Sequence, residues 1–140
     1  MPEVLVKNLH SQKKVKLKKI KSLAGKVLEG EKNRQNVNII LTDDKYITRL
    51  NRKFLNKNRS TDVLSFGMKE DKKLSPEPDF LGELYISLDR AEKQAKEYNQ
   101  SLEKEVNLLV THGLLHLLGY DHKKREKKEK MRKKEEKYLR

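Results

Sequence analysis

The sequence of 140 residues contains no cysteine. Its absence excludes disulfide bonds, thiolate metal ligands and soft-metal clusters built on thiolates. Long apolar runs are also missing: residues 106–118 form the longest, but polar residues interrupt it and it is too short to span a membrane. The first ten residues, MPEVLVKNLH, lack the apolar core of a signal peptide. We therefore expect a single cytoplasmic domain that has neither a membrane partner nor a disulfide-linked one.

Positive charge is concentrated at the two ends of the chain. Residues 1–35 contain 10 Lys and Arg against 3 Asp and Glu, and residues 123–140 contain 11 against 4. Residues 36–122 are nearly neutral, although the net charge of the whole chain is +13. Localised basic charge is typical of proteins that bind nucleic-acid phosphates. The alternative is a solvated helix surface, or a heat-adapted surface rich in Lys and Glu.

The hydrophobic pattern predicts a small mixed α/β (α+β) fold. Strands are expected at residues 4–6, 37–41, 62–66 and 82–87, and an exposed, mobile loop at 67–79. Helices are expected from Lys14 to a stop at Gly30, and after caps at Thr42, Ser87 and Ser101. The predicted apolar faces contain Ile47, Leu50 and Phe54 in the second helix, and Leu88, Ala91, Ala95 and Tyr98 in the third. The sheet of about four strands should carry helices on both faces, and the helix from Ser101 should be the most buried because it is apolar nearly all round.

The stretch HGLLHLLGYDH, residues 112–122, contains three of the four histidines. His112 and His116 are about one helical turn apart, so they project from the same side of a helix. Gly119 predicts the end of that helix, after which His122 can fold back toward the other two imidazoles. Three imidazoles with an open coordination position are typical of catalytic zinc. We therefore expect one zinc ion, or another divalent transition metal, at His112, His116 and His122.

The ligand spacing is also that of the metzincin proteases, with one difference. Gly113 stands where those enzymes carry the glutamate that takes a proton from water at the metal. Peptide hydrolysis by that mechanism is therefore disfavoured. The alternative for the histidines is an ordinary surface or core pair, which is common on helices. The third histidine and the apolar residues around the pair favour the metal.

The chain is thus predicted to consist of a single metal-dependent hydrolase domain, residues 1–122, and a basic C-terminal helical tail, residues 123–140. The tail is helix-prone and mostly without an apolar stripe. We expect it to be either a solvated helix or an arm that is ordered only when bound.

These motifs resemble the YbeY endoribonuclease family. The histidine block matches the family's signature, and T-D-V-L-S-F at 61–66 and L-G-E-L-Y-I-S at 81–87 resemble two further blocks, so that the resemblance spans about residues 36–122. It implies a zinc-dependent endoribonuclease that cleaves single-stranded RNA, with His112, His116 and His122 as the zinc ligands. It also implies a role in 3′ maturation of small-subunit (16S) ribosomal RNA and in ribosome quality control, with rRNA and the small ribosomal subunit as partners.

The chain departs from the family pattern near the second block. Leu55 stands where the family usually has an arginine, and Ser60 and Gly67 replace two usual prolines. Arg59 is our candidate for the guanidinium that neutralises charge on the phosphate; its alternative is an ordinary solvated loop arginine. Asp121 is the second catalytic candidate: it would orient a ligand imidazole or position water, or else simply cap the turn after Gly119.

Two other functions stay open. One is an RNA-binding ribosome-assembly factor, whose metal only locks the helix to the following turn. The other is a different metal-dependent hydrolase that acts on peptides or small molecules; Gly113 argues against the peptidase, and the positive charge argues for a polyanionic substrate.

Overall fold

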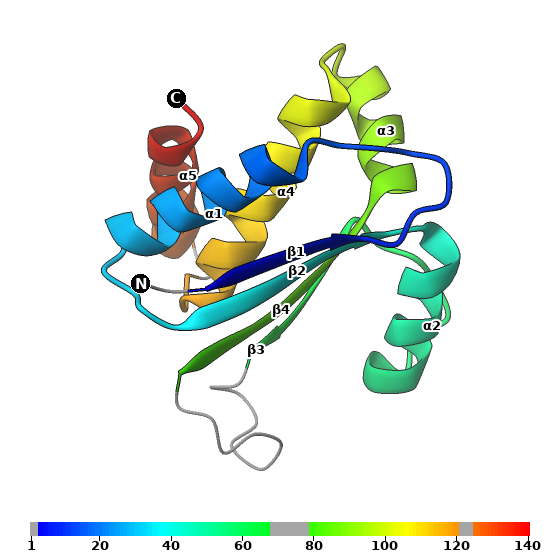
Figure 1. The fold of residues 1–140 in the computed structure, drawn as a ribbon, viewed down its shortest axis with the longest axis horizontal. Coiled ribbons are helices and arrows are strands. Elements are labelled where there is room, and N and C mark those ends of the chain that lie inside the picture. The colour runs from blue at the N-terminus through cyan, green and yellow to red at the C-terminus, as the bar shows by residue number, and fades with distance from the viewer. Residues whose placement is uncertain (1–2, 68–78, 121–124) are drawn as a thin grey trace.

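The computed structural model describes residues 3–67, 79–120 and 125–140. The described residues contain a four-stranded sheet, which confirms the predicted mixed α/β fold (Figure 1). The strands are β1 (Val4–Asn8), β2 (Asn36–Thr42), β3 (Val63–Gly67) and β4 (Phe80–Ser87). Their order in the sheet is β1-β2-β4-β3, where β3 is antiparallel to β4 and the other neighbours are parallel. Most of the predicted loop at 67–79 lies outside the described residues.

Five helices are formed by the described part of the chain. They are α1 (Leu17–Gly30), α2 (Asp44–Leu55), α3 (Leu88–Glu97), α4 (Leu102–Leu117) and α5 (Arg125–Tyr138). Figure 1 shows α1, α4 and α5 on one side of the sheet and α2 on the other, as predicted for helices on both faces. No helix within the described ranges is long and apolar enough to cross a membrane.

The starts of α3 and α4 agree with the sequence, whereas α1 begins at Leu17 rather than at Lys14 and α2 has a different cap. Ser87 and Ser101 cap α3 and α4, because each side chain accepts a hydrogen bond from a backbone N–H in the first turn. In α2 the cap is Asp43, which accepts from the Tyr46 N–H at 2.9 Å, and not Thr42, which ends β2. Two predicted apolar positions are also wrong: Phe54 is 56% exposed and Tyr98 is 72% exposed.

Helix α4 is the centre of the core, as predicted. Nine of its 16 residues are buried, and they pack against the sheet, α1, α3 and α5. Each large apolar side chain that is removed from water here contributes about 1.5–3 kcal/mol. The solvent-accessible side of α4 is therefore narrow, and only a few residues contribute side chains to it.

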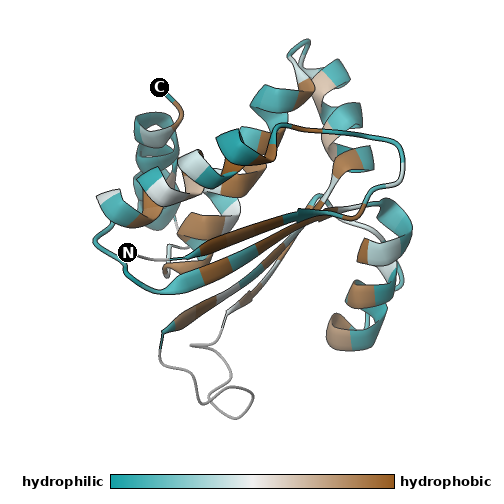
Figure 2. Cartoon of the chain, in the orientation of Figure 1, coloured by the Kyte–Doolittle hydropathy of each residue, from teal (hydrophilic) through white to brown (hydrophobic). Residues whose placement is uncertain are grey.

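The basic C-terminal segment differs from the expectation of a solvated helix or an unordered arm. Helix α5 is almost entirely hydrophilic (Figure 2), yet Met131 and Tyr138 are both 2% exposed and belong to the core. Glu31, next to the end of α1, accepts hydrogen bonds from Tyr138 Oη, from Tyr120 Oη at 2.5 Å and from Lys134 Nζ at 3.2 Å. Although burial opposes ionisation, these hydrogen bonds lower the pKa of Glu31. Two buried side chains and one carboxylate thus dock a hydrophilic helix.

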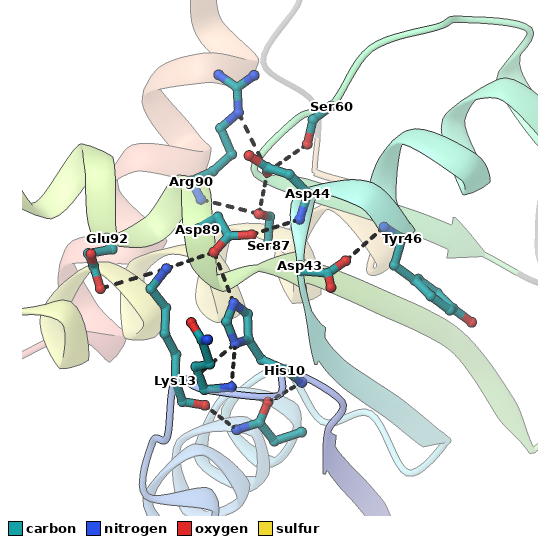
Figure 3. A network of polar contacts seen from close by, with 12 residues as sticks. His10, Lys13, Asp43, Asp44, Tyr46, Ser60, Ser87, Asp89, Arg90 and Glu92 are labelled. Carbon is teal, nitrogen blue, oxygen red and sulfur yellow. Dashed lines mark hydrogen bonds and ion pairs between the residues drawn. The ribbon is translucent and has the colours of Figure 1, made fainter.

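Asp89 joins three segments at the edge of the sheet where β1, β2 and β4 end (Figure 3). Its carboxylate lies 2.9 Å from His10 Nε2 and accepts hydrogen bonds from Lys13 Nζ at 2.7 Å and from the backbone N–H of Asp44 at 3.0 Å. Burial opposes ionisation, but these three contacts hold the pKa of Asp89 well below its ordinary value of 3.8. Asp89 thereby ties the segment after β1 to the starts of α2 and α3.

We predict that Asp89→Asn lowers the free energy of unfolding by about 1–3 kcal/mol at neutral pH, because hydrogen bonds to a charged group are lost. The folded pKa is lower than the unfolded one, so this stabilisation is present above about pH 4 and is lost as the pH falls further. The difference between wild type and variant, measured by urea unfolding, should therefore shrink in acid. The control is Glu103→Gln, whose ion pair with Lys19 is exposed and should contribute about 1 kcal/mol or less. A pH-independent difference would contradict the assignment to this carboxylate.

Candidate functional site

His112 and His116 lie on the narrow accessible side of α4. The side chain of His112 is 36% exposed and His116 is exposed, whereas Gly113, Leu114 and Leu115 between them are buried. The helix thus presents both imidazoles one turn apart, as the spacing predicted. The apolar surroundings, however, are not a reason to expect a metal, because the imidazoles do not lie within them.

Gly119 ends the helix region as predicted. Its φ of +103° is a conformation that favours glycine. The Gly119 N–H donates to the His116 carbonyl at 3.0 Å, and the Tyr120 N–H donates to the Leu115 carbonyl at 3.0 Å, which closes the last turn. The predicted third ligand, His122, and the catalytic candidate Asp121 lie outside the described residues. Among the residues that are described, no group of three His, Asp or Glu could hold a metal ion, so the complete ligand set stays a prediction.

Glu135 of α5 holds the imidazole of His112. Its Oε1 accepts a hydrogen bond from His112 Nδ1 at 2.7 Å, and its side chain is only 17% exposed. This hydrogen bond and the negative charge raise the pKa of His112 against the opposing effect of burial. A carboxylate on one ring nitrogen is the usual companion of a histidine that binds metal through the other. The two described donors therefore fit a zinc site.

The structure explains why residue 113 is glycine. A Cβ on Gly113 would lie 2.8 Å from Cδ2 of Leu84 in β4 and 3.3 Å from Cγ2 of Val63 in β3. A side chain at this point would therefore require Leu84 or the helix to shift. The general base of the metzincin proteases would crowd Leu84 and Val63 here, which adds a steric reason to the chemical one.

A cavity of about 540 Å³ lies between α2, the segment before β3 and α3, and it contains the candidate Arg59. It is lined by Asn51, Leu55, Lys57, Arg59, Ser60, Thr61, Asp62, Val63, Leu64, Arg90 and Gln94. Arg59 is exposed, and its backbone carbonyl accepts a hydrogen bond from Asn51 Nδ2 at 2.9 Å. Leu55, which is 48% exposed, lines the same cavity. Leu55, at the position of the usual family arginine, and the candidate Arg59 thus line the same cavity.

Asp62 and Val63 connect this cavity to the histidines. The negative charge of Asp62 contributes to the raised pKa of His112, after the larger effects of the hydrogen bond and charge of Glu135. Gln94 Nε2 donates to Asp62 Oδ2 at 3.3 Å and so helps to hold the carboxylate. Val63 is both a wall of the cavity and the neighbour of Gly113 in α4. The concave region is thus lined by cations and by a carboxylate, Asp62, whose charge acts on the imidazole of His112.

Two residues that act on His112, Asp62 and Glu135, were not predicted as site residues. Asp62 belongs to the T-D-V-L-S-F block but received no role, since a carboxylate before a strand has many uses. Glu135 is one of four glutamates in a lysine-rich segment. A signal did exist: Met131, Glu135 and Tyr138 are spaced i, i+4 and i+7 and therefore share one side of a helix. A stripe of two apolar residues is too narrow to identify that side from sequence.

Comparisons with known proteins agree with the resemblance. The family model described as Endoribonuclease YbeY matches residues 5–140. The chain is similar to the Endoribonuclease YbeY of Heliobacterium modesticaldum, with 46% identity over 114 residues, 74% of this chain and 68% of that protein. It is also similar to the Endoribonuclease YbeY of Desulforamulus reducens, with 42% identity over 141 residues, 95% of this chain and 92% of that protein.

A solved structure has the same fold. The solution structure of TM1509 from Thermotoga maritima matches with a TM-score of 0.70 and 32% sequence identity, over 97% of this chain and 86% of that one. The similarity thus extends beyond the central block of residues 36–122 and includes both basic ends.

We predict that Gly113→Ala lowers the free energy of unfolding by about 1–3 kcal/mol, because the added methyl group forces α4 away from Leu84. The matched control is Gly25→Ala in α1, where the added Cβ meets nothing within 4 Å. This control should raise stability by about 0.5–1 kcal/mol, since alanine is the better helix former. Chemical unfolding of the two variants measures both effects; a stable Gly113→Ala protein would show that the packing at this point is loose.

Proposed function

Because the chain belongs to the YbeY endoribonuclease family, we propose that it hydrolyses phosphodiester bonds in single-stranded RNA with the help of a zinc ion. The observation that carries the proposal is the pair of accessible imidazoles on α4, one of them held by a carboxylate, beside a concave region that contains arginines. The substrate in this proposal is the 3′ region of 16S rRNA in the small ribosomal subunit, within rRNA maturation and ribosome quality control. The compartment is the cytoplasm, where ribosomes are assembled.

Three histidines would hold the zinc: His112, His116 and His122. Zinc, when bound, supplies Lewis acidity toward a phosphoryl oxygen and toward water. His112 would bind through Nε2, because Nδ1 is engaged by Glu135. Gly113 leaves no general base at the protease position. Asp121 would position water or orient a ligand ring.

Arg59 would neutralise negative charge on the phosphate that is cleaved. A guanidinium can donate two parallel hydrogen bonds to phosphate oxygens, and Arg59 lines the cavity that neighbours His112. Leu55, in the position of the usual family arginine, opens on the same cavity. Arg59, four residues after Leu55, would thus place its guanidinium in the same cavity.

The RNA backbone would run along the basic surface formed by α1 and α5. These helices come from opposite ends of the chain and lie next to each other, since Lys26 Nζ donates to the Tyr138 carbonyl at 3.2 Å (Figure 1). Lys127, Lys130 and Lys134 line a second cavity of about 520 Å³ together with Gly119 and Tyr120. These lysines would therefore face phosphates close to the turn that leads to His122.

We predict that His116→Ala abolishes cleavage of a single-stranded RNA oligonucleotide while the affinity for RNA and the fold are retained, because His116 is exposed and packs no core. Chelation of metal from the wild type should have the same effect, and added zinc should restore cleavage. The measurements are a gel-based cleavage assay, a filter-binding or anisotropy assay, elemental analysis and circular dichroism.

The variant must be purified in parallel with the wild type, so that contaminating nucleases appear equally in both. Cleavage that persists in His116→Ala would refute the metal-dependent nuclease. RNA binding without any cleavage by zinc-loaded wild type would favour the assembly factor with a structural metal. Cleavage of peptides by the native protein would favour the other class of hydrolase.

We predict that Arg59→Ala lowers kcat/KM for RNA cleavage by about 10- to 100-fold, since it removes charge-assisted hydrogen bonds of about 1.5–3 kcal/mol. Leu55→Arg in the Arg59→Ala background should recover part of the loss, because both positions line one cavity. The control is Arg52→Ala, whose guanidinium binds Asn58 Oδ1 and does not line the cavity. Equal activity of Arg59→Ala and wild type would show that Arg59 is an ordinary loop residue.

A further inference from the structure

We propose that Glu135 is a positioning residue of the metal site: it holds the imidazole of His112 so that Nε2 is presented to the cation. The inference rests on the proposed function, because it needs His112 to be a ligand. It gives helix α5 a role in the site in addition to any contact with RNA.

The geometry of the contact between Glu135 and His112 supports this role. Glu135 Oε1 lies 2.7 Å from His112 Nδ1, a short distance that is typical of a charge-assisted hydrogen bond. A carboxylate can only accept, so Nδ1 carries the proton, and in the neutral imidazole Nε2 then presents its lone pair. The bond therefore selects the tautomer and the ring orientation that a metal requires, and it makes the imidazole a stronger donor.

The second step is the fixed position of Glu135. Met131 and Tyr138, one turn before it and one turn after it, are each 2% exposed. Tyr138 fills the space over Gly30 at the end of α1, where an added Cβ would lie 2.5 Å from its hydroxyl oxygen. Because both neighbouring turns are anchored in the core, the carboxylate is held in place at little further cost in side-chain entropy.

The third step is the specificity of this one carboxylate. Glu136, the next residue, has a side chain that is 61% exposed and pairs with Arg132 on its own helix. Lys134, the preceding residue, binds Glu31. Of these three consecutive residues, only Glu135 forms a hydrogen bond or ion pair with α4 in the described structure, and its side chain is 17% exposed. Glu136 is thus a control that differs in position but not in chemistry.

The competing explanation is an ion pair that only clamps α5 to α4. Both explanations predict some loss of stability when the carboxylate is removed. They differ in the metal: a clamp leaves the affinity of the folded protein for zinc unchanged, whereas a positioning residue typically changes metal affinity by about 10- to 100-fold.

The experiment is a zinc titration of metal-free full-length protein against a chromophoric chelator, for wild type, Glu135→Gln, Glu135→Ala, Glu136→Gln and His116→Ala. Glu135→Ala should bind zinc about 10- to 100-fold more weakly than wild type. Glu135→Gln keeps a neutral acceptor and should show a smaller loss, and Glu136→Gln should show none. The visible absorption of bound Co²⁺ should change in the Glu135 variants and not in Glu136→Gln, which reports on the ligand geometry rather than on activity.

The outcomes distinguish a failure of the proposed metal function from a failure of the positioning role of Glu135. If wild type binds zinc no better than His116→Ala, the proposed metal function fails, and this inference fails with it. If wild type binds zinc tightly and both Glu135 variants match it in affinity and in the Co²⁺ spectrum, only this inference is overturned, and the pair is a clamp. Should Glu135→Ala fail to fold, Glu135→Gln decides, because it preserves the volume of the side chain and a hydrogen-bond acceptor.

Discussion

The close approach of α4 to the sheet at Gly113 is the constraint on which the site depends. With no side chain at this position, Leu84 and Val63 pack directly against the helix. In its C-terminal half, helix α4 is consequently buried along most of its surface, and His112 and His116 lie on the side that is left accessible. The glycine thus allows α4 to pack close to the sheet, and it leaves no side chain at the position from which a metzincin protease supplies its base.

Much of the fold follows from local sequence. The four strands and the helices between them were predicted because each carries a periodic apolar face bounded by residues with clear turn or capping chemistry, such as Ser87, Ser101 and Gly119. The errors have local causes as well. Asp43 replaces Thr42 as the cap of α2 because the strand continues through Thr42. Phe54 and Tyr98 lie on the predicted helix faces but are exposed. Hydrophobic periodicity predicts the side of a helix on which a residue lies, but not whether the core extends far enough to bury it.

The candidate site was predictable only where its residues are close in sequence. His112 and His116 are related by one helical turn, so their common direction follows from backbone geometry alone. Glu135 is brought to His112 by the docking of α5, which depends on two buried side chains and on the interactions of Glu31. In this segment, rich in lysine and glutamate, only the narrow stripe of Met131 and Tyr138 marks the side on which that carboxylate lies. The relation of Asp62 to His112 likewise exists only after β3 has paired with β4 beneath α4.

Docking of α5 also brings the two basic ends of the chain next to each other. In the sequence, the two basic segments are separated by residues 36–122, whose net charge is close to zero. In the fold, α1 and α5 both pack against α4 and contact each other. Their lysines therefore repel across a short distance, a cost that the carboxylate of Glu31, bound to Lys134, partly offsets. A protein that brings like charges together at some cost to its stability gains a surface on which a polyanion is favoured, and here that surface borders the helix that carries the histidines.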